Sequence, residues 1–266
     1  MKNSPSYNYL ERYLIKVQSK GRFSLTLKEL TEQFNISQKA ILQSIYRLKS
    51  KGLLAQVRKE FYAIIPPQYS DKGILPPALF INDMMGYLER EYYVGLLSAA
   101  ALHGAGHQQP MEFQVMTKKP ALRPIMNQLL YIRFFTKKKW EKELVVEIKT
   151  DAGFINVSSP ELTLFDLVFY SKRIGGINRV IPVIEELAEV VKPSKLALAT
   201  KSQITPTAQR LGYLLYKMGN DALANSLYSV LDDKKFKEAP LSHTHRTKQG
   251  ELDNFWKVAI NTTLDF

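Results

Sequence analysis

The chain has 266 residues, with 37 Lys and Arg against 25 Asp and Glu, and no cysteine. The length allows one large domain or two modest ones, and the lack of cysteine excludes a disulfide framework, a thiol nucleophile and a Cys-ligated zinc. Residues 1–70 contain 12 Lys and Arg and four Glu, a net charge of +8, whereas the rest of the chain carries +4. This excess indicates a polyanionic partner at the amino-terminal end, such as nucleic acid or an acidic membrane surface.

The sequence predicts neither an export signal nor a membrane span. The amino terminus lacks the apolar stretch of a signal peptide. The longest uncharged run covers residues 92–111, but only residues 92–102 are persistently apolar. A bilayer span needs about 20 such residues. We therefore expect a soluble protein that acts in the cytoplasm.

The first 70 residues predict three helices followed by a β-hairpin. Apolar residues recur at helical spacing before Thr26, which caps a second helix, and Ser37 caps a third helix that ends at Gly52. Two β-prone runs at 53–57 and 61–65 flank three polar residues and predict the hairpin. This order of elements is typical of a winged helix-turn-helix.

The third helix is the predicted recognition helix, because one face is apolar and the opposite face is polar and basic. Gln and Arg side chains can pair with base edges, and Lys side chains suit phosphates. The predicted DNA-binding residues are Gln38, Lys39, Gln43, Tyr46, Arg47 and Lys49 on this helix and Arg58 and Lys59 at the hairpin tip.

Two other interpretations of this basic face stay open. The charges could form only a solvated surface, and Tyr46 could equally cover a domain junction. Three-helix domains with a hairpin also dock proteins. If the partner is double-stranded DNA, salt screening would make a single copy bind weakly. We therefore expect either a dimer on DNA or several copies on repeated sites.

Prolines and glycine between residues 66 and 77 predict a linker, which divides the chain into domains 1–70 and 78–266. The second domain is predicted to be α+β, with a small, mostly antiparallel sheet and C-terminal helices. Helices are predicted at 77–89 and 93–102, strands at 112–117, 130–136, 144–150 and 154–157, and further helices at 162–170, 179–191, 205–218 and 222–231. A polar tail follows from residue 232 to about residue 250.

Three segments carry a more specific pattern. Residues 92–104 contain two aromatic residues, a glycine, a run of small residues and a final Leu-His-Gly. Residues 157–167 contain Ser-Pro-Glu, Thr-Leu and Asp-Leu. The third segment is the hairpin at residues 57–64. In their order and spacing these segments, over roughly residues 7–230, resemble the AbiEi-type antitoxin family of bacterial toxin–antitoxin and abortive-infection systems. The hairpin turn departs from that family's pattern, because this chain has Glu60 and Phe61 where the family commonly has a glycine.

The resemblance implies a phage-defence repressor whose winged helix binds its own promoter. It also implies that the C-terminal domain neutralises a co-encoded nucleotidyltransferase-like toxin. The same residues have structural interpretations. Small residues at 98–101 suit close helix packing, and Ser159, Pro160 and Glu161 suit a helix start. Asp166 is expected to satisfy a neighbouring backbone group or an arginine rather than perform chemistry.

An enzymatic function finds little support in the sequence. Glu147 and Lys149 match the E-x-K end of a restriction-nuclease-like metal site, but neither Asp83 nor Glu112 is well placed as the second carboxylate. Two histidine pairs, at 103 and 107 and at 243 and 245, lack the helix or further ligands of a metal site. We predict no enzyme, no metal and no cofactor. A metal-dependent nuclease with a winged-helix targeting domain stays an alternative, as does an effector-sensing regulator without a toxin.

Overall fold

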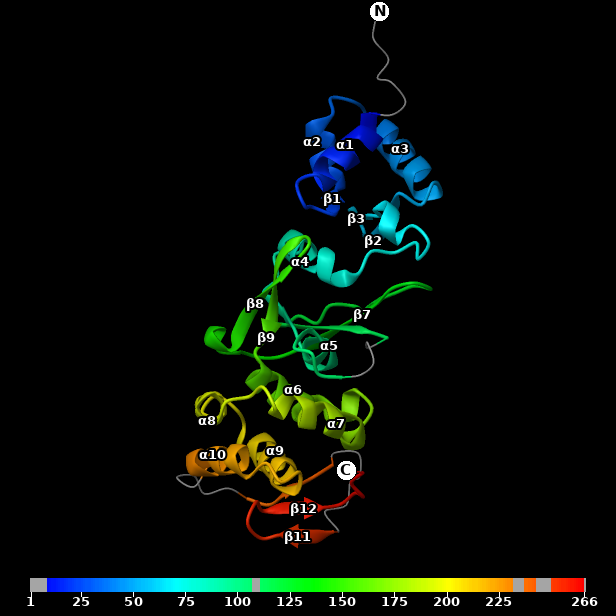
Figure 1. The fold of residues 1–266 in the computed structure, drawn as a ribbon. Helices are drawn as coiled ribbons and strands as arrows, with labels where there is room; N and C mark the ends of the chain where they lie inside the picture. Colours follow the sequence, from blue (N-terminus) through cyan, green and yellow to red (C-terminus); the bar gives the residue numbers. More distant parts are fainter. Residues whose placement is uncertain (1–8, 107–110, 232–236, 243–249, 266) are drawn as a thin grey trace, which may run out of the picture. The chain divides into compact units, whose positions relative to one another are not determined.

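The amino-terminal part of the chain forms three helices and a small sheet. The computed structural model describes residues 9–106, 111–231, 237–242 and 250–265 (Figure 1). The elements in chain order are α1 (Tyr9–Gln18), β1 (Ser24–Thr26), α2 (Leu27–Gln33), α3 (Gln38–Ser50), β2 (Leu54–Arg58) and β3 (Phe61–Ile64). The strands pair antiparallel in the order β1-β3-β2. This is a winged helix-turn-helix, so the predicted amino-terminal fold is confirmed.

Local signals in the sequence set the ends of α2 and α3. The Thr26 hydroxyl accepts a hydrogen bond from the Glu29 backbone N–H at 3.1 Å, and the Ser37 hydroxyl accepts one from the Ala40 N–H at 3.3 Å. Gly52 follows α3 with φ +72°, a conformation that glycine adopts readily. The sequence does not predict strand β1, because a strand of three residues is too short to show an alternating pattern.

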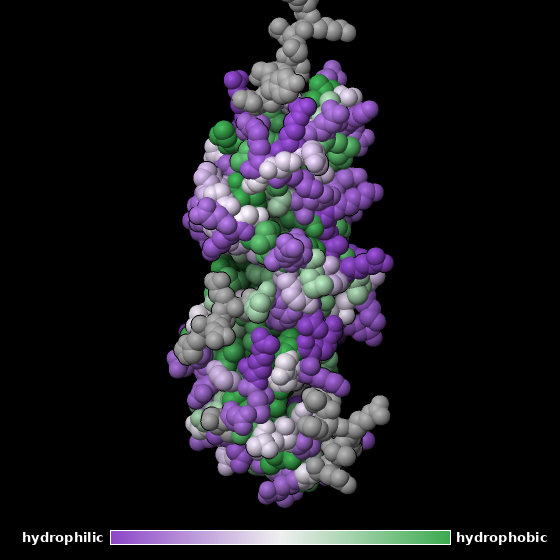
Figure 2. Space-filling model, turned by 90° about the vertical axis from the view of Figure 1, so that its right-hand side faces the viewer, coloured by the Kyte–Doolittle hydropathy of each residue, from purple (hydrophilic) through white to green (hydrophobic). Residues whose placement is uncertain are grey.

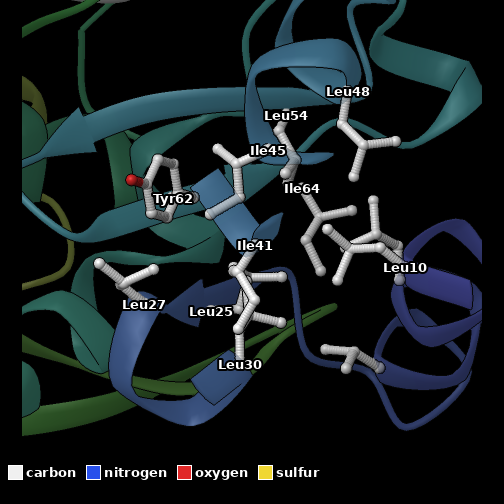
Figure 3. Packing of buried hydrophobic residues seen from close by; sticks show 12 residues of the cluster. Leu10, Leu25, Leu27, Leu30, Ile41, Ile45, Leu48, Leu54, Tyr62 and Ile64 are labelled. Carbon is white, nitrogen blue, oxygen red and sulfur yellow. The ribbon is translucent and has the colours of Figure 1, made fainter. Parts of the chain in front are cut away.

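A single apolar cluster holds the winged helix together (Figure 3). Ile41, Ile45 and Leu48 lie on one face of α3 and are at most 4% exposed. They are spaced so that one side of the helix is apolar, and that side faces leucines of α1 and α2. The remaining buried members are Leu10, Leu14, Val17, Leu25, Leu27, Leu30, Leu54, Tyr62 and Ile64. Burial of one face leaves the other face of α3 exposed.

The turn between β2 and β3, the wing, contains a residue in an unfavourable backbone conformation. Glu60 has φ 60°, which is strained for a residue with a Cβ. We expect Glu60→Gly to raise the free energy of unfolding by about 0.5 kcal/mol, because relief of strain exceeds the added entropy of the unfolded chain. Urea unfolding followed by circular dichroism measures this change.

Gly52→Ala is the matched control for the wing turn. Its φ is also in the left-handed region, and nothing lies within 4 Å of the added Cβ. It should lower the free energy of unfolding by about 1 kcal/mol through backbone conformation alone. A lower stability of Glu60→Gly would contradict the assignment of strain to Glu60.

The next part of the chain contributes a second, six-stranded sheet. Its elements are α4 (Ile81–Tyr87), β4 (Tyr92–Val94), α5 (Leu96–Leu102), β5 (Phe113–Thr117), β6 (Ile125–Met126), β7 (Tyr131–Thr136), the 3₁₀ turn η3 (Lys142–Leu144), β8 (Val145–Thr150) and β9 (Gly153–Ser158). The strand order is β6-β7-β5-β4-β9-β8. Strands β6 and β7 pair antiparallel, whereas β4 and β9 pair parallel. All four predicted strands are present, and the α+β class is confirmed.

The helix predicted at 93–102 is wrong in its first residues. Residues 92–94 form β4, and the helix begins only at Leu96. The aromatic and β-branched residues Tyr92, Tyr93 and Val94 suit a buried strand, and a short apolar run does not distinguish a strand from a helix. Gly95 is the N-cap of α5, and Leu96, the first residue of the helix, has φ 57°.

The C-terminal part is mainly helical. It contains α6 (Pro160–Tyr170), the 3₁₀ turn η4 (Ser171–Arg173), α7 (Ile177–Ala188), α8 (Pro193–Thr200), α9 (Thr205–Lys217), α10 (Asp221–Leu231), β10 (Ala239–Pro240), β11 (Glu251–Asp253) and β12 (Val258–Ile260). The four helices predicted after residue 160 are confirmed, and α8 is additional. The short strands form a third sheet, β10-β12-β11, which the sequence does not predict.

The chain folds into two compact units. The first contains the chain up to Tyr92, Thr117–Thr136 and Glu147–Asn156; the second contains Tyr93–Met116, Lys137–Val146 and the chain from Val157 onward. The proline-rich segment forms two 3₁₀ turns, η1 (Pro67–Tyr69) and η2 (Pro77–Leu79). The division into domains 1–70 and 78–266 stays a prediction.

Among the described residues, no helix has the length and apolar character needed to cross a bilayer. The face of the molecule drawn in Figure 2 carries many hydrophilic side chains with apolar ones scattered among them.

Candidate functional site

The exposed face of α3 carries the predicted base-reading and phosphate-binding residues. Gln38, Lys39, Gln43, Tyr46, Arg47 and Lys49 are all exposed, and all but Lys49 line one shallow hollow together with Leu42. Residues three and four positions apart share a helix face, which explains why they meet. The helix has no Asp or Glu, so no carboxylate of its own competes for a polyanion. Tyr46 is 72% exposed.

The orientation of α3 is fixed from its buried side. The Ser44 hydroxyl lies 3.0 Å from the Tyr9 hydroxyl on α1 and donates to the Ala40 carbonyl at 3.0 Å. At the end of the helix, the Lys49 ammonium donates to the Gln56 side-chain oxygen on β2 at 3.0 Å. These contacts connect α3 to its neighbours without covering the polar face. The arrangement can present amides, a phenol and cations to a groove of DNA.

The two predicted wing residues have different surroundings. The Lys59 side chain is exposed, whereas Arg58 is half-buried. The Arg58 guanidinium donates through Nη2 to the Arg123 carbonyl at 2.6 Å and lies 5.3 Å from the centroid of the Phe134 ring. Burial lowers the pKa of Arg58 below its ordinary value. Arg58 is therefore engaged within the first unit, and neither Arg123 nor Phe134 was identified from the sequence as its partner.

The second unit contains a buried ion pair on α6. The Asp166 side chain is 1% exposed, its Oδ1 accepts from the Lys137 ammonium at 2.6 Å, and its Oδ2 accepts from the Tyr93 hydroxyl at 2.7 Å. Burial and the Asp166 charge raise the pKa of Tyr93 well above its ordinary value. The structural role expected for Asp166 is confirmed, with a lysine and a tyrosine as its partners in place of a backbone group or an arginine.

The two motif segments of the second half are connected by hydrogen bonds. His103, after α5, lies with Nε2 2.7 Å from the Ser158 carbonyl, and the Ser158 hydroxyl lies 2.7 Å from the Thr163 hydroxyl. The Ser159 hydroxyl accepts from the Leu162 N–H at 3.3 Å and caps α6. These contacts give His103 and the Ser-Pro segment structural roles. The other three histidines considered lie outside the described residues.

Metal-binding geometry does not occur in the part of the chain that the structure describes. No group of three or more His, Asp or Glu side chains is placed there to hold an ion. Glu147 and Lys149, which suggested a nuclease, are exposed on β8.

The fold defines a winged-helix protein with a mixed α+β region after it. Residues 93–217 match the family model described as the AbiEi antitoxin C-terminal domain. This match supports an AbiEi-type antitoxin family for that part of the chain, and the resemblance seen in the sequence is confirmed.

Solved structures give a wider comparison. The RV2827C protein from Mycobacterium tuberculosis superposes with a TM-score of 0.67 at 17% identity, over 97% of this chain and 92% of that chain, and so shares the fold. An antigenic nucleotidyltransferase-like protein from Paracoccidioides brasiliensis gives a TM-score of 0.38 at 12% identity, over 56% of this chain and 88% of that chain. That value is too low to support an argument. No curated protein matches the sequence.

Proposed function

We propose that this protein is an antitoxin that also represses its own operon. In this proposal the winged helix binds the promoter, and the AbiEi domain opposes a co-encoded nucleotidyltransferase-like toxin in the bacterial cytoplasm. The observation that supports it most is one chain that combines an AbiEi antitoxin domain with an exposed, carboxylate-free recognition helix. The nature of the toxin comes from the family resemblance alone.

The DNA-binding part of the proposal assigns a role to each exposed side chain. Gln38, Gln43 and Arg47 are the candidates for base edges, since amides and guanidinium groups can form paired hydrogen bonds there. Lys39, Lys49 and Lys59 are the candidates for phosphates. Tyr46 and Leu42 offer apolar contact to a base methyl group. Because phosphate contacts weaken with salt, we propose that two or more copies occupy repeated sites in the promoter.

Co-expression separates the two proposed activities. A toxin encoded beside this gene should arrest growth when expressed alone, and the wild-type chain should restore growth. A variant with Lys39→Ala and Arg47→Ala should still restore growth while a reporter driven by the operon promoter becomes derepressed. Absence of a toxin gene next to this one, or failure of the wild-type chain to restore growth, would contradict the antitoxin proposal. A reporter that the wild-type chain does not repress would contradict autorepression.

A further inference from the structure

Hydrogen bonds and a ring contact connect the wing tip to other segments of the first unit. The Arg58 guanidinium donates to the Arg123 carbonyl at 2.6 Å. On α4, the Tyr87 hydroxyl donates to the Lys59 carbonyl at 3.4 Å, and the Tyr87 ring packs 5.6 Å from the Phe61 ring. These contacts connect the wing to α4 and to the main-chain carbonyl of Arg123. Since Arg123 lies 65 residues after Arg58, this neighbourhood exists only in the fold.

Two cations belong to the segments that these contacts connect. Lys59 and Arg123 both have exposed side chains. Between the wing and the β6 segment lies an open groove of about 510 Å³, lined by residues 57–59, Tyr87, Leu88 and residues 124–127. None of these lining residues is acidic, although Glu60 and Glu89 follow lining residues in the sequence. A groove bordered by cations in this way suits an anionic ligand.

The segment that supplies Arg123 adds to the positive charge of the winged helix. Residues 113–140 contain seven Lys and Arg and no Asp or Glu. Four of these cations, Lys118, Lys119, Arg123 and Arg133, belong to Thr117–Thr136, which is part of the first unit together with the winged helix. The segment Thr117–Thr136 therefore carries a net charge of +4, whereas the rest of this unit after residue 70 carries −3. Nucleic-acid backbone is the ligand that such a distribution favours.

We propose that Lys59 and Arg123 form a phosphate clamp, which binds the DNA backbone beside the wing and which Arg58 holds in position. Ammonium and guanidinium groups form charge-assisted hydrogen bonds with phosphate oxygens. Arg58 is a positioning residue here, because its guanidinium donates a hydrogen bond to the Arg123 carbonyl and lies over the Phe134 ring. The clamp adds a contact from outside the winged helix, and it rests on the proposed DNA-binding function.

Binding of the full chain to promoter DNA tests the clamp. The variant Lys59→Ala with Arg123→Ala should weaken DNA binding about tenfold or more near 0.15 M salt. The negative slope of log K against log salt should become shallower by about two. Binding to DNA of unrelated sequence should weaken by a similar factor, since phosphates carry no sequence information. The control variant, Arg12→Ala with Lys16→Ala, removes one exposed Arg and one exposed Lys from α1 and should change neither quantity.

The role of Arg58 has its own readout. Arg58→Met should weaken DNA binding in the wild-type background. It should add little in the Arg123→Ala background, because Arg58 acts by positioning the contact between the Arg123 side chain and phosphate, which that background lacks. Additive effects would overturn the positioning role. If the clamp variant binds with wild-type affinity and salt slope while Lys39→Ala with Arg47→Ala abolishes binding, the clamp is wrong and the DNA-binding proposal stands. If both variants bind as wild type, the recognition helix itself is wrong.

Discussion

Replacing Lys39 and Arg47 with alanine should weaken promoter binding by about 100-fold near physiological salt. Loss of a paired guanidinium contact to a base costs about 1–3 kcal/mol, and loss of a phosphate contact adds to it. Both side chains are exposed on a helix whose packing depends on the opposite face, so the fold should be retained. Fluorescence anisotropy with a labelled promoter fragment measures the change, and circular dichroism checks the fold.

The matched control again removes one Arg and one Lys from α1. Arg12→Ala with Lys16→Ala lowers the net charge by the same amount at exposed positions of the winged helix. If binding depended on net charge alone, the two double variants would weaken it equally. We expect the α1 variant to bind within about twofold of wild type, because only the α3 variant removes base and phosphate contacts. Equal losses would contradict recognition through α3.

Replacing Asp166 with alanine should lower the stability of the second unit by about 3–5 kcal/mol. The change leaves the Lys137 ammonium, which is 19% exposed, without its carboxylate, and it leaves the buried Tyr93 hydroxyl without its acceptor. Both tryptophans of the chain, Trp140 and Trp256, lie in this unit. Urea unfolding followed by tryptophan fluorescence therefore reports on the unit that contains Asp166.

Two further variants show whether the unpaired charge causes the loss. Asp166→Leu combined with Lys137→Met should recover most of the stability, because replacing a buried ion pair by apolar groups is often close to neutral. Glu185→Ala removes an exposed carboxylate from α7 and should change stability by less than about 0.5 kcal/mol. An Asp166→Ala protein as stable as wild type would show that this pair does not stabilise the fold.

The parts of the fold that depend on local chemistry were predictable. Thr26 and Ser37 cap their helices through their own hydroxyls, and Gly52 ends α3 with the backbone conformation that glycine permits. The spacing of Ile41, Ile45 and Leu48 predicts both the buried side of α3 and its exposed side. Sequence alone could therefore place the candidate DNA-binding face.

The parts that depend on distant residues were not predictable. Strand β1 has three residues and is defined by its pairing with β3, about 37 residues later in the chain. Strand β10 pairs with β12, and neither strand exceeds three residues. Arg58 meets the Arg123 carbonyl, and Asp166 meets Lys137, only because the fold brings them together. The run of cations at 113–140 was the one signal in the sequence that pointed toward Arg123.

Binding of the wild-type chain to its own promoter tests the central claim most directly. Anisotropy near 0.15 M salt should compare the promoter fragment with a scrambled fragment of equal length and composition. We expect the promoter to bind at least about 1,000-fold more tightly, as specific DNA-binding proteins do. Equal affinity for the two fragments, or no binding to either, would contradict the proposal that this protein represses its own operon through its winged helix.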